Sequence, residues 1–123
     1  MPAFNEENTI LDILEKVKSV DLIGGIIKEI IIVNDFSTDK TKEVVQKFIS
    51  EGNEKEVKYY EHEKNLGKGA ALHSGIQKAT GDELVIQEAD LEYDPNEYNV
   101  LLFIRLCFAF YLVWYHFYSL VWS

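Results

Sequence analysis

The chain has 123 residues, which is enough for one domain with a single hydrophobic core and too few for two. Its net charge of -9 argues against a general nucleic-acid-binding protein, because such proteins need lysine and arginine facing the phosphates. The only cysteine, Cys107, can form neither an internal disulfide nor a thiolate metal cluster. The N-terminal stretch MPAFNEENTI lacks the pattern of a signal peptide, so we expect a cytoplasmic protein.

Three apolar runs of strand length alternate with three amphipathic helical patterns in residues 1–99. The helical patterns are Ile10, Leu11, Leu14 and Val17; Val44, Val45, Phe48 and Ile49; and Ala71, Leu72 and Ile76, with Gly81 as a C-terminal stop. The predicted strands cover residues 29–35, 57–62 and 83–89. They are about 27 residues apart, which leaves room for right-handed crossover helices and implies a parallel sheet. We therefore expect an α/β fold whose ligand site follows the carboxyl ends of the strands.

The segment after the first predicted strand, residues 33–41, reads VNDFSTDKT. Asp35 lies at the end of the strand, where a carboxylate that faces the ligand can accept hydrogen bonds from a base. Residues 37–39 are interpreted more simply as a turn that caps a helix beginning near Lys40. A role in ligand binding is therefore assigned to Asp35 alone.

The segment after the second predicted strand, residues 63–75, reads EKNLGKGAALHSG. Gly67 and Gly69 allow the backbone to approach a ligand closely, and Lys68 adds a positive charge at a helix N-terminus, where free amides favour anions. The spacing does not match a Walker A loop. Two interpretations remain open, an anion-binding loop and an ordinary glycine-containing turn into a helix.

The segment at the end of the third predicted strand, residues 84–95, reads LVIQEADLEYDP and places four acids within seven positions. Carboxylates this close repel one another unless a cation or a hydrogen-bond network offsets them. Glu88 and Asp90 can point at one hard cation, with Glu92 as a third ligand, and Mg²⁺ or Mn²⁺ suits such oxygen ligands. The alternative interpretation is a solvated acidic loop.

Other polar residues receive a structural interpretation or none. Asp94 and Pro95 are predicted to begin the next helix, as its cap and its first turn. The three histidines, His62, His73 and His116, share no metal-ligand spacing, and we assign them no chemistry.

Four segments, taken in order, resemble motifs of the family-2 glycosyltransferases, in particular the polyprenyl (dolichyl) phosphate sugar transferases. They are PAFNEENTI, IIVNDFSTDKT, NLGKGAALHSGIQKATGD and QEADLEYDP, and the match covers residues 2–99. The resemblance implies the parallel-sheet, Rossmann-like half of a GT-A fold. It also implies transfer of a sugar from a nucleotide-diphosphate sugar to a polyprenyl phosphate or glycan acceptor, with Mg²⁺ or Mn²⁺ on the pyrophosphate.

The resemblance also assigns roles to individual residues. By this match Pro2, Ala3, Phe4 and Glu6 would line the nucleoside pocket, Asp35 would read the base, Lys68 would lie near the donor, and Asp90 would be the principal metal ligand beside Glu88 and Glu92. The chain departs from the family where Asn34 replaces an aspartate, Phe36 a glycine and Glu88 an aspartate. The family's first strand, which would precede Pro2, is expected to be absent.

The last part of the chain, residues 100–123, differs sharply in composition, with Arg105 as its only formal charge. Residues 106–122 form a run of 17 without charge, at the lower limit for spanning a bilayer. Three interpretations remain open: a membrane anchor, a helix packed on the open sheet, and a truncated or frame-shifted end. We therefore divide the chain into a nucleotide-sugar-binding part, residues 1–99, and an apolar aromatic tail, residues 100–123.

The acceptor half of the resembling family, with the aspartate expected as base, has no counterpart in this sequence. We therefore expect a donor-binding half that binds nucleotide and transfers little or no sugar. Two alternatives are a nucleotide-sugar-binding fragment without catalysis and a phospho-receiver-like module, in which acids at the strand ends would bind metal and accept phosphate.

Overall fold

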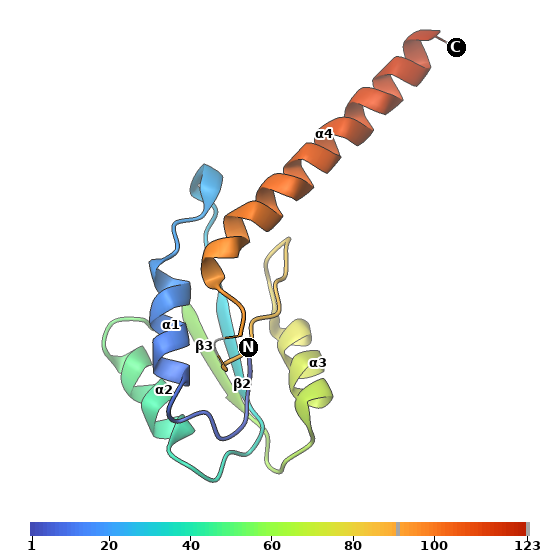
Figure 1. The fold of residues 1–123 in the computed structure, drawn as a ribbon. Coiled ribbons are helices and arrows are strands. Elements are labelled where there is room, and N and C mark those ends of the chain that lie inside the picture. Colours follow the sequence, from blue (N-terminus) through green and yellow to red (C-terminus); the bar gives the residue numbers. More distant parts are fainter. Residues whose placement is uncertain (91, 123) are drawn as a thin grey trace.

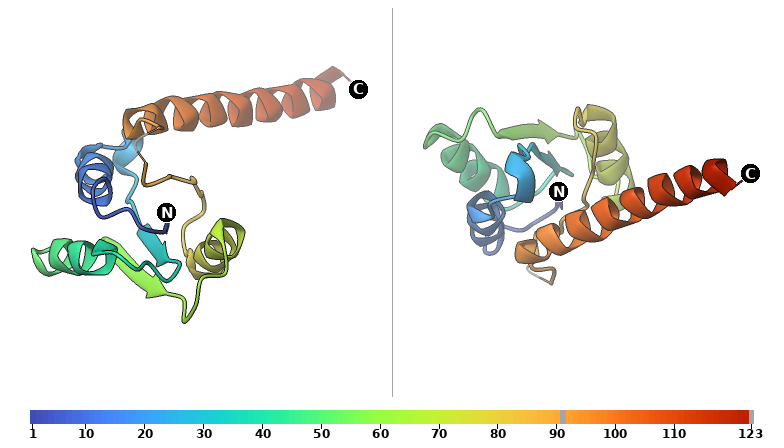
Figure 2. Two further views of the ribbon diagram at one scale, coloured as in Figure 1. Left: turned by 60° about the horizontal axis from the view of Figure 1, so that its bottom comes forward. Right: turned by 90° about the horizontal axis from the view of Figure 1, so that it is seen from above.

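The structure, a computed structural model, describes residues 1–90 and 92–122, and the side chains of these residues apart from those of residues 111 and 113–122. Its sheet has three parallel strands in the order β1 (Pro2–Ala3), β2 (Ile30–Asn34) and β3 (Val57–Glu61). The helices are α1 (Ile10–Ser19), α2 (Thr41–Ser50), α3 (Lys68–Lys78) and α4 (Tyr98–Trp122), with short 3₁₀ turns η1 (Ile23–Gly25) and η2 (Pro95–Glu97). Helices α1 and α2 lie on one side of the sheet and α3 on the other (Figures 1 and 2). The expected α/β fold with parallel strands is thus confirmed.

The predicted helices form because their apolar residues gather on one face, which packs on the sheet. The buried side chains are Ile10, Ile13, Leu14 and Val17 on α1; Thr41, Val45 and Phe48 on α2; and Ala71 on α3. Two residues of the predicted faces, Leu11 and Ile76, are instead exposed, at 38% and 51%. Helix α3 ends at Lys78, before the predicted stop at Gly81, because Ala79 already has an extended backbone. Asp94 caps η2 by accepting a hydrogen bond from Asn96 N at 3.0 Å, and Pro95 lies in its first turn, as predicted.

The third predicted strand, residues 83–89, does not form. The apolar side chains of residues 84–86 are 47–49% exposed, and the segment lines an apolar cavity of about 210 Å³ together with Met1 and Ile31. A continuous apolar run becomes a strand only when a neighbouring strand offers it backbone partners. The edge strand β1 is only two residues long, and its pairs are Pro2 with Val33 and Ala3 with Asn34.

The same pairs correct a second expectation. The family's first strand was expected to be absent, and the structure has a two-residue strand, β1, that pairs with β2 at this edge of the sheet. It extends the sheet beside β2 and places the residues that follow Ala3 at the carboxyl edge of the sheet. Short as it is, β1 therefore positions part of the candidate site.

Helix α4 projects away from the sheet (Figure 1). Its first residues are anchored: Tyr98 Oη donates to Gln87 Oε1 at 2.6 Å, and Asn99 Oδ1 accepts from Ile23 N at 2.9 Å. Further along, Phe108 is 63% exposed, which does not match a helix packed on the sheet. Within the part of the chain that the structure describes, no helix combines the length and apolarity needed to cross a membrane.

Removing residues 100–123 should reduce self-association and leave the free energy of unfolding within about 1 kcal/mol of the full chain, because the removed residues that are described are mostly exposed. Light scattering and urea denaturation measure the two effects. A truncation after Asp94, which also removes Tyr98 and Asn99, is the control and should lose stability. If the chain ending at Asn99 unfolds, the tail completes the core, and the division at residue 99 is wrong.

Candidate functional site

A cleft of about 370 Å³ opens at the carboxyl edge of the sheet. Its lining comes from four separate segments of the chain: Pro2, Ala3, Phe4 and Glu6; Asp35; Asn65, Gly67, Lys68 and Ala71; and Glu88, Ala89 and Asp90. Every residue proposed for nucleotide binding lies in this lining, as do two of the three proposed metal ligands. The fold thus brings together residues that the sequence separates by more than 80 positions.

The turn after β1 is fastened to the turn after β2. Asn5 has a left-handed backbone, with φ of 55°, and its side-chain oxygen accepts from Thr38 N at 2.8 Å. Thr41 Oγ1 accepts from Glu6 N at 2.8 Å, and Asp39 Oδ2 accepts from Glu7 N at 3.1 Å. The N-cap residue of α2 is Lys40, without a side-chain capping bond, and of the predicted capping turn only Asp39 contacts the helix start, where its Oδ1 accepts from Thr41 N at 3.0 Å. Residues 37–41 instead fix the backbone that presents Phe4 and Glu6 to the cleft.

Asp35 follows β2 and is only 2% exposed. Its Oδ1 accepts from Leu66 N at 2.9 Å and lies 2.7 Å from His62 Nδ1, and its Oδ2 accepts from Gly67 N at 2.7 Å. Burial disfavours the charged form, but the hydrogen bonds from Leu66, His62 and Gly67 outweigh it and lower the pKa of Asp35. The carboxylate predicted to read a base is thus ionised and also holds the turn before α3.

His62 is a functional candidate that the sequence reasoning missed. It follows β3 directly, and its Nε2 lies 2.9 Å from Ser74 Oγ on α3. The strand register could have indicated this residue. Asn34 of β2 pairs with Glu61 of β3, so the residues that follow them, Asp35 and His62, lie side by side.

Two departures from the family pattern have visible structural roles. Asn34 is fully buried; its Nδ2 donates to Tyr59 Oη at 2.8 Å, and its Oδ1 accepts from Ser37 N at 3.1 Å. Phe36 stands where the family has glycine, and it adopts φ of 61°, the left-handed conformation that glycine adopts without strain. The amide at position 34 therefore fixes the turn, whereas the side chain at position 36 strains it.

Gly67 and Lys68 form the entry to α3. Gly67 has φ of 91° and ψ of 161°, a region open almost only to glycine. Lys68 Nζ donates to Glu88 Oε1 at 2.5 Å, and this hydrogen bond raises the pKa of Lys68. The entry turn thus connects Asp35 to the acidic segment.

Gly67→Ala should destabilise the protein by roughly 1–3 kcal/mol, because alanine cannot adopt this conformation without strain. Gly69→Ala is the matched control: its φ is helical, an added Cβ meets no atom within 4 Å, and alanine should stabilise α3 by about 0.5–1 kcal/mol. Urea denaturation of both variants measures the difference. Equal stabilities would mean that the turn at Gly67 is not held in this conformation.

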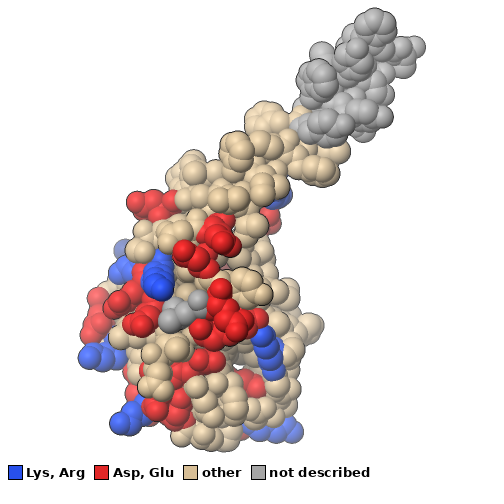
Figure 3. All heavy atoms as spheres, in the orientation of Figure 1, with Lys and Arg blue, Asp and Glu red and all other residues tan. Residues whose placement is uncertain are grey.

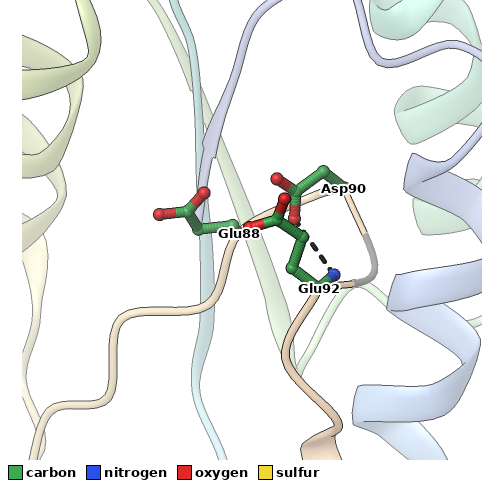
Figure 4. A group of neighbouring side chains, drawn as sticks. All are labelled: Glu88, Asp90 and Glu92. Carbon is green, nitrogen blue, oxygen red and sulfur yellow. Dashed lines mark hydrogen bonds between the residues drawn. The ribbon is translucent and has the colours of Figure 1, made fainter.

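The acidic segment brings its carboxylates together. Oxygens of Glu88, Asp90 and Glu92 lie within 4.8 Å of one another, and Asp90 Oδ1 accepts from Glu92 N at 3.2 Å (Figure 4). Gln87, also missed by the sequence reasoning, fixes the segment by donating from Nε2 to the carbonyl oxygens of Glu88 and Tyr93, each at 3.1 Å. The metal site stays a prediction beside the alternative of a solvated acidic loop, because Asp90 and Glu92 are exposed.

The cluster fits a hard divalent cation. Ligands around octahedral Mg²⁺ lie about 3–4 Å apart, so the exposed side chains of Asp90 and Glu92 need only a small movement to close on an ion. Acidic side chains also gather on the molecular face that includes this region (Figure 3). A cation there would offset their mutual repulsion.

The comparisons with known proteins identify the family of the chain. The family model for glycosyl transferase family 2 matches residues 1–103. The chain belongs to this family. It is similar to a poly-beta-1,6-N-acetyl-D-glucosamine synthase of Staphylococcus epidermidis, with 34% identity over 96 residues, covering 78% of this chain and 22% of the relative.

Two further relatives are transferases named for lipid phosphates. An undecaprenyl-phosphate 4-deoxy-4-formamido-L-arabinose transferase of Pectobacterium carotovorum is 31% identical over 97 residues, covering 79% of this chain and 29% of the relative. A dolichol-phosphate mannosyltransferase of Pyrococcus furiosus is 30% identical over 96 residues, covering 78% of this chain and 26% of the relative. The glycosyltransferase resemblance is thus confirmed, and the phospho-receiver alternative gains no support. The chain spans less than a third of the length of these relatives.

Proposed function

We propose that this chain is the donor-binding part of a glycosyltransferase, and that its cleft holds a nucleotide-diphosphate sugar together with Mg²⁺ or Mn²⁺. The observation that carries the proposal is the convergence of four sequence segments on one cleft, whose lining includes Asp35, Glu88 and Asp90, with Glu92 beside the last two. Family membership supports the same assignment.

Each of three side chains is assigned to a different part of the ligand. Asp35 uses three of its roughly four acceptor positions within the protein, which leaves one for a donor group of the base. Phe4, 45% exposed in the lining of the cleft, offers an apolar face to the nucleoside. Lys68 reaches the acidic end and offers positive charge near the phosphates.

Glu88, Asp90 and Glu92 would hold the cation. When bound, a divalent ion supplies Lewis-acid stabilisation of the charge on a departing nucleoside diphosphate. The carboxylates have no such effect alone, because their charge would repel the pyrophosphate. Binding of the nucleotide should therefore depend on the metal.

The acceptor of the sugar and the cellular location of the protein are further proposals. The names of two relatives contain undecaprenyl phosphate and dolichol phosphate, which supports a polyprenyl phosphate acceptor, and the synthase relative supports a glycan. The tail, residues 100–123, is mostly exposed and apolar where its side chains are described, and we propose it as the part that associates with a membrane, at the cytoplasmic face.

Titration of the 123-residue chain with UDP-sugars and GDP-sugars tests the proposal. We expect binding with Mn²⁺ or Mg²⁺ and none in excess chelator, and equal affinity in both conditions would contradict the metal site. We also expect little or no transfer to polyprenyl phosphate, because residues 98–123 contain no carboxylate that could act as base. Sustained turnover would show that the chain, or a partner, supplies an acceptor site and that it is more than a nucleotide-sugar-binding fragment.

A further inference from the structure

We propose that His62 is a positioning residue, which acts through Asp35 to set the turn at Leu66 and Gly67 and so the part of the cleft that begins there. The inference concerns the turn itself, and its consequence for ligand binding rests on the function proposed above. His62 is not part of the lining of the cleft, so its effect must pass through other residues.

His62, which follows β3, contacts residues of β2 and α3. The backbone N–H of His62 donates to Asn34 O at 2.9 Å, which fixes the residue beside the end of β2. Its Nδ1 lies 2.7 Å from Asp35 Oδ1, and its Nε2 lies 2.9 Å from Ser74 Oγ. The side chain is 12% exposed, so little water competes for these contacts.

The chemistry of the partners fixes the orientation of the ring. An ionised carboxylate can only accept, so Nδ1 must carry a hydrogen and donate it to Asp35. In the neutral ring Nε2 then accepts the hydrogen of the Ser74 hydroxyl. The ring is held from both sides, and it in turn holds the carboxylate of Asp35 in one orientation.

That orientation determines the turn before α3. The two amides that the carboxylate accepts from, those of Leu66 and Gly67, precede the helix and lack helical partners. Gly67 is flexible by itself, and its unusual backbone conformation persists here because Asp35 holds it. Lys68, which lines the cleft, starts from this turn.

A matched pair of substitutions separates the two contacts of the ring. His62→Asn places an amide nitrogen near the position of Nδ1 and keeps a donor for Asp35, whereas His62→Gln places it near Nε2 and keeps only the contact with Ser74. Ser74→Ala removes the contact with α3 and leaves the donor to Asp35 in place. Denaturation of all three variants corrects for any general loss of stability.

Hydrogen exchange of the Leu66 and Gly67 amides, followed by NMR without ligand, is the first measurement. We expect about tenfold faster exchange in His62→Gln, the size expected for loss of one charge-assisted hydrogen bond, and little change in His62→Asn or Ser74→Ala. The affinity for a nucleoside diphosphate with Mn²⁺ should fall in His62→Gln and change little in His62→Asn or Ser74→Ala.

Equal exchange in His62→Gln and His62→Asn, whether fast or slow, would overturn the inference, because the donor to Asp35 would then not control the turn. If the unsubstituted chain binds no nucleotide, the proposed function fails, and the exchange rates of Leu66 and Gly67 still decide whether His62 sets the turn.

Discussion

Asp90→Asn should weaken metal-dependent nucleotide binding by about 100-fold or more, while Asp94→Asn should leave it unchanged. Asp90 contributes a carboxylate to the cluster and lines the cleft. Even the loss of outer-shell partners costs 10–100-fold at metal sites, and the loss of a charged ligand should cost at least as much. Calorimetric titration of a nucleoside diphosphate in the presence of Mn²⁺ gives the affinities.

The two variants form a matched pair, because each replaces one acid by its amide in the same segment. Asparagine at position 90 can still accept from Glu92 N, and asparagine at position 94 can still cap η2. Neither change should therefore disturb the fold. If both variants bind as the unsubstituted chain does, or if both lose affinity equally, the cluster is not the metal site.

Asp35→Ala should reduce the free energy of unfolding by about 3–5 kcal/mol, the cost of removing one partner from a buried charged network. The substitution leaves the amides of Leu66 and Gly67 and the ring of His62 without their acceptor. Urea denaturation measures the loss. Asp82→Ala, at an exposed position, removes the same charge and should cost less than about 0.5 kcal/mol.

The effect of Asp35→Ala should depend on pH. The folded structure lowers the pKa of Asp35, so its ionised form stabilises the protein above the unfolded pKa of about 3.9. This contribution is lost as the pH falls from that value through the lower folded pKa. The difference between Asp35→Ala and the unsubstituted chain should therefore be largest near pH 7 and should narrow below about pH 4. A difference that stays constant with pH would mean that the charge of Asp35 adds nothing to stability.

The sequence predicted the elements that depend on local pattern. Most of the buried faces of α1 and α2 follow from helical spacing, although Leu11 is exposed and Ile13 is buried in α1. Two of the three expected strands, β2 and β3, form where their apolar runs lie. The third run failed because strand formation depends on a partner elsewhere in the chain, and β1 offers only two residues. Nothing in the sequence of residues 84–86 shows that this partner is missing.

The candidate site shows the same division between local and long-range information. The end of β2 located Asp35, because parallel strands place their carboxyl ends at one edge. The acidic segment was placed after a third strand that does not form, and Glu88 and Asp90 nevertheless line the same cleft. His62 and Gln87 were missed because their roles depend on contacts with Ser74, Tyr93 and Tyr98, which no spacing rule predicts. The pairing register of β2 with β3 would have found His62.

The ion pair between Lys68 and Glu88 gives the acidic cluster a counter-ion of its own. A divalent cation held by the cluster would have to compete with the ammonium group for the Glu88 carboxylate, so each arriving ion would release Lys68. The freed lysine would then be available to a phosphate oxygen at the same end of the cleft. Metal and nucleotide would in this way assist each other through thermodynamic linkage, with the apparent affinity for either rising in the presence of the other by the same factor.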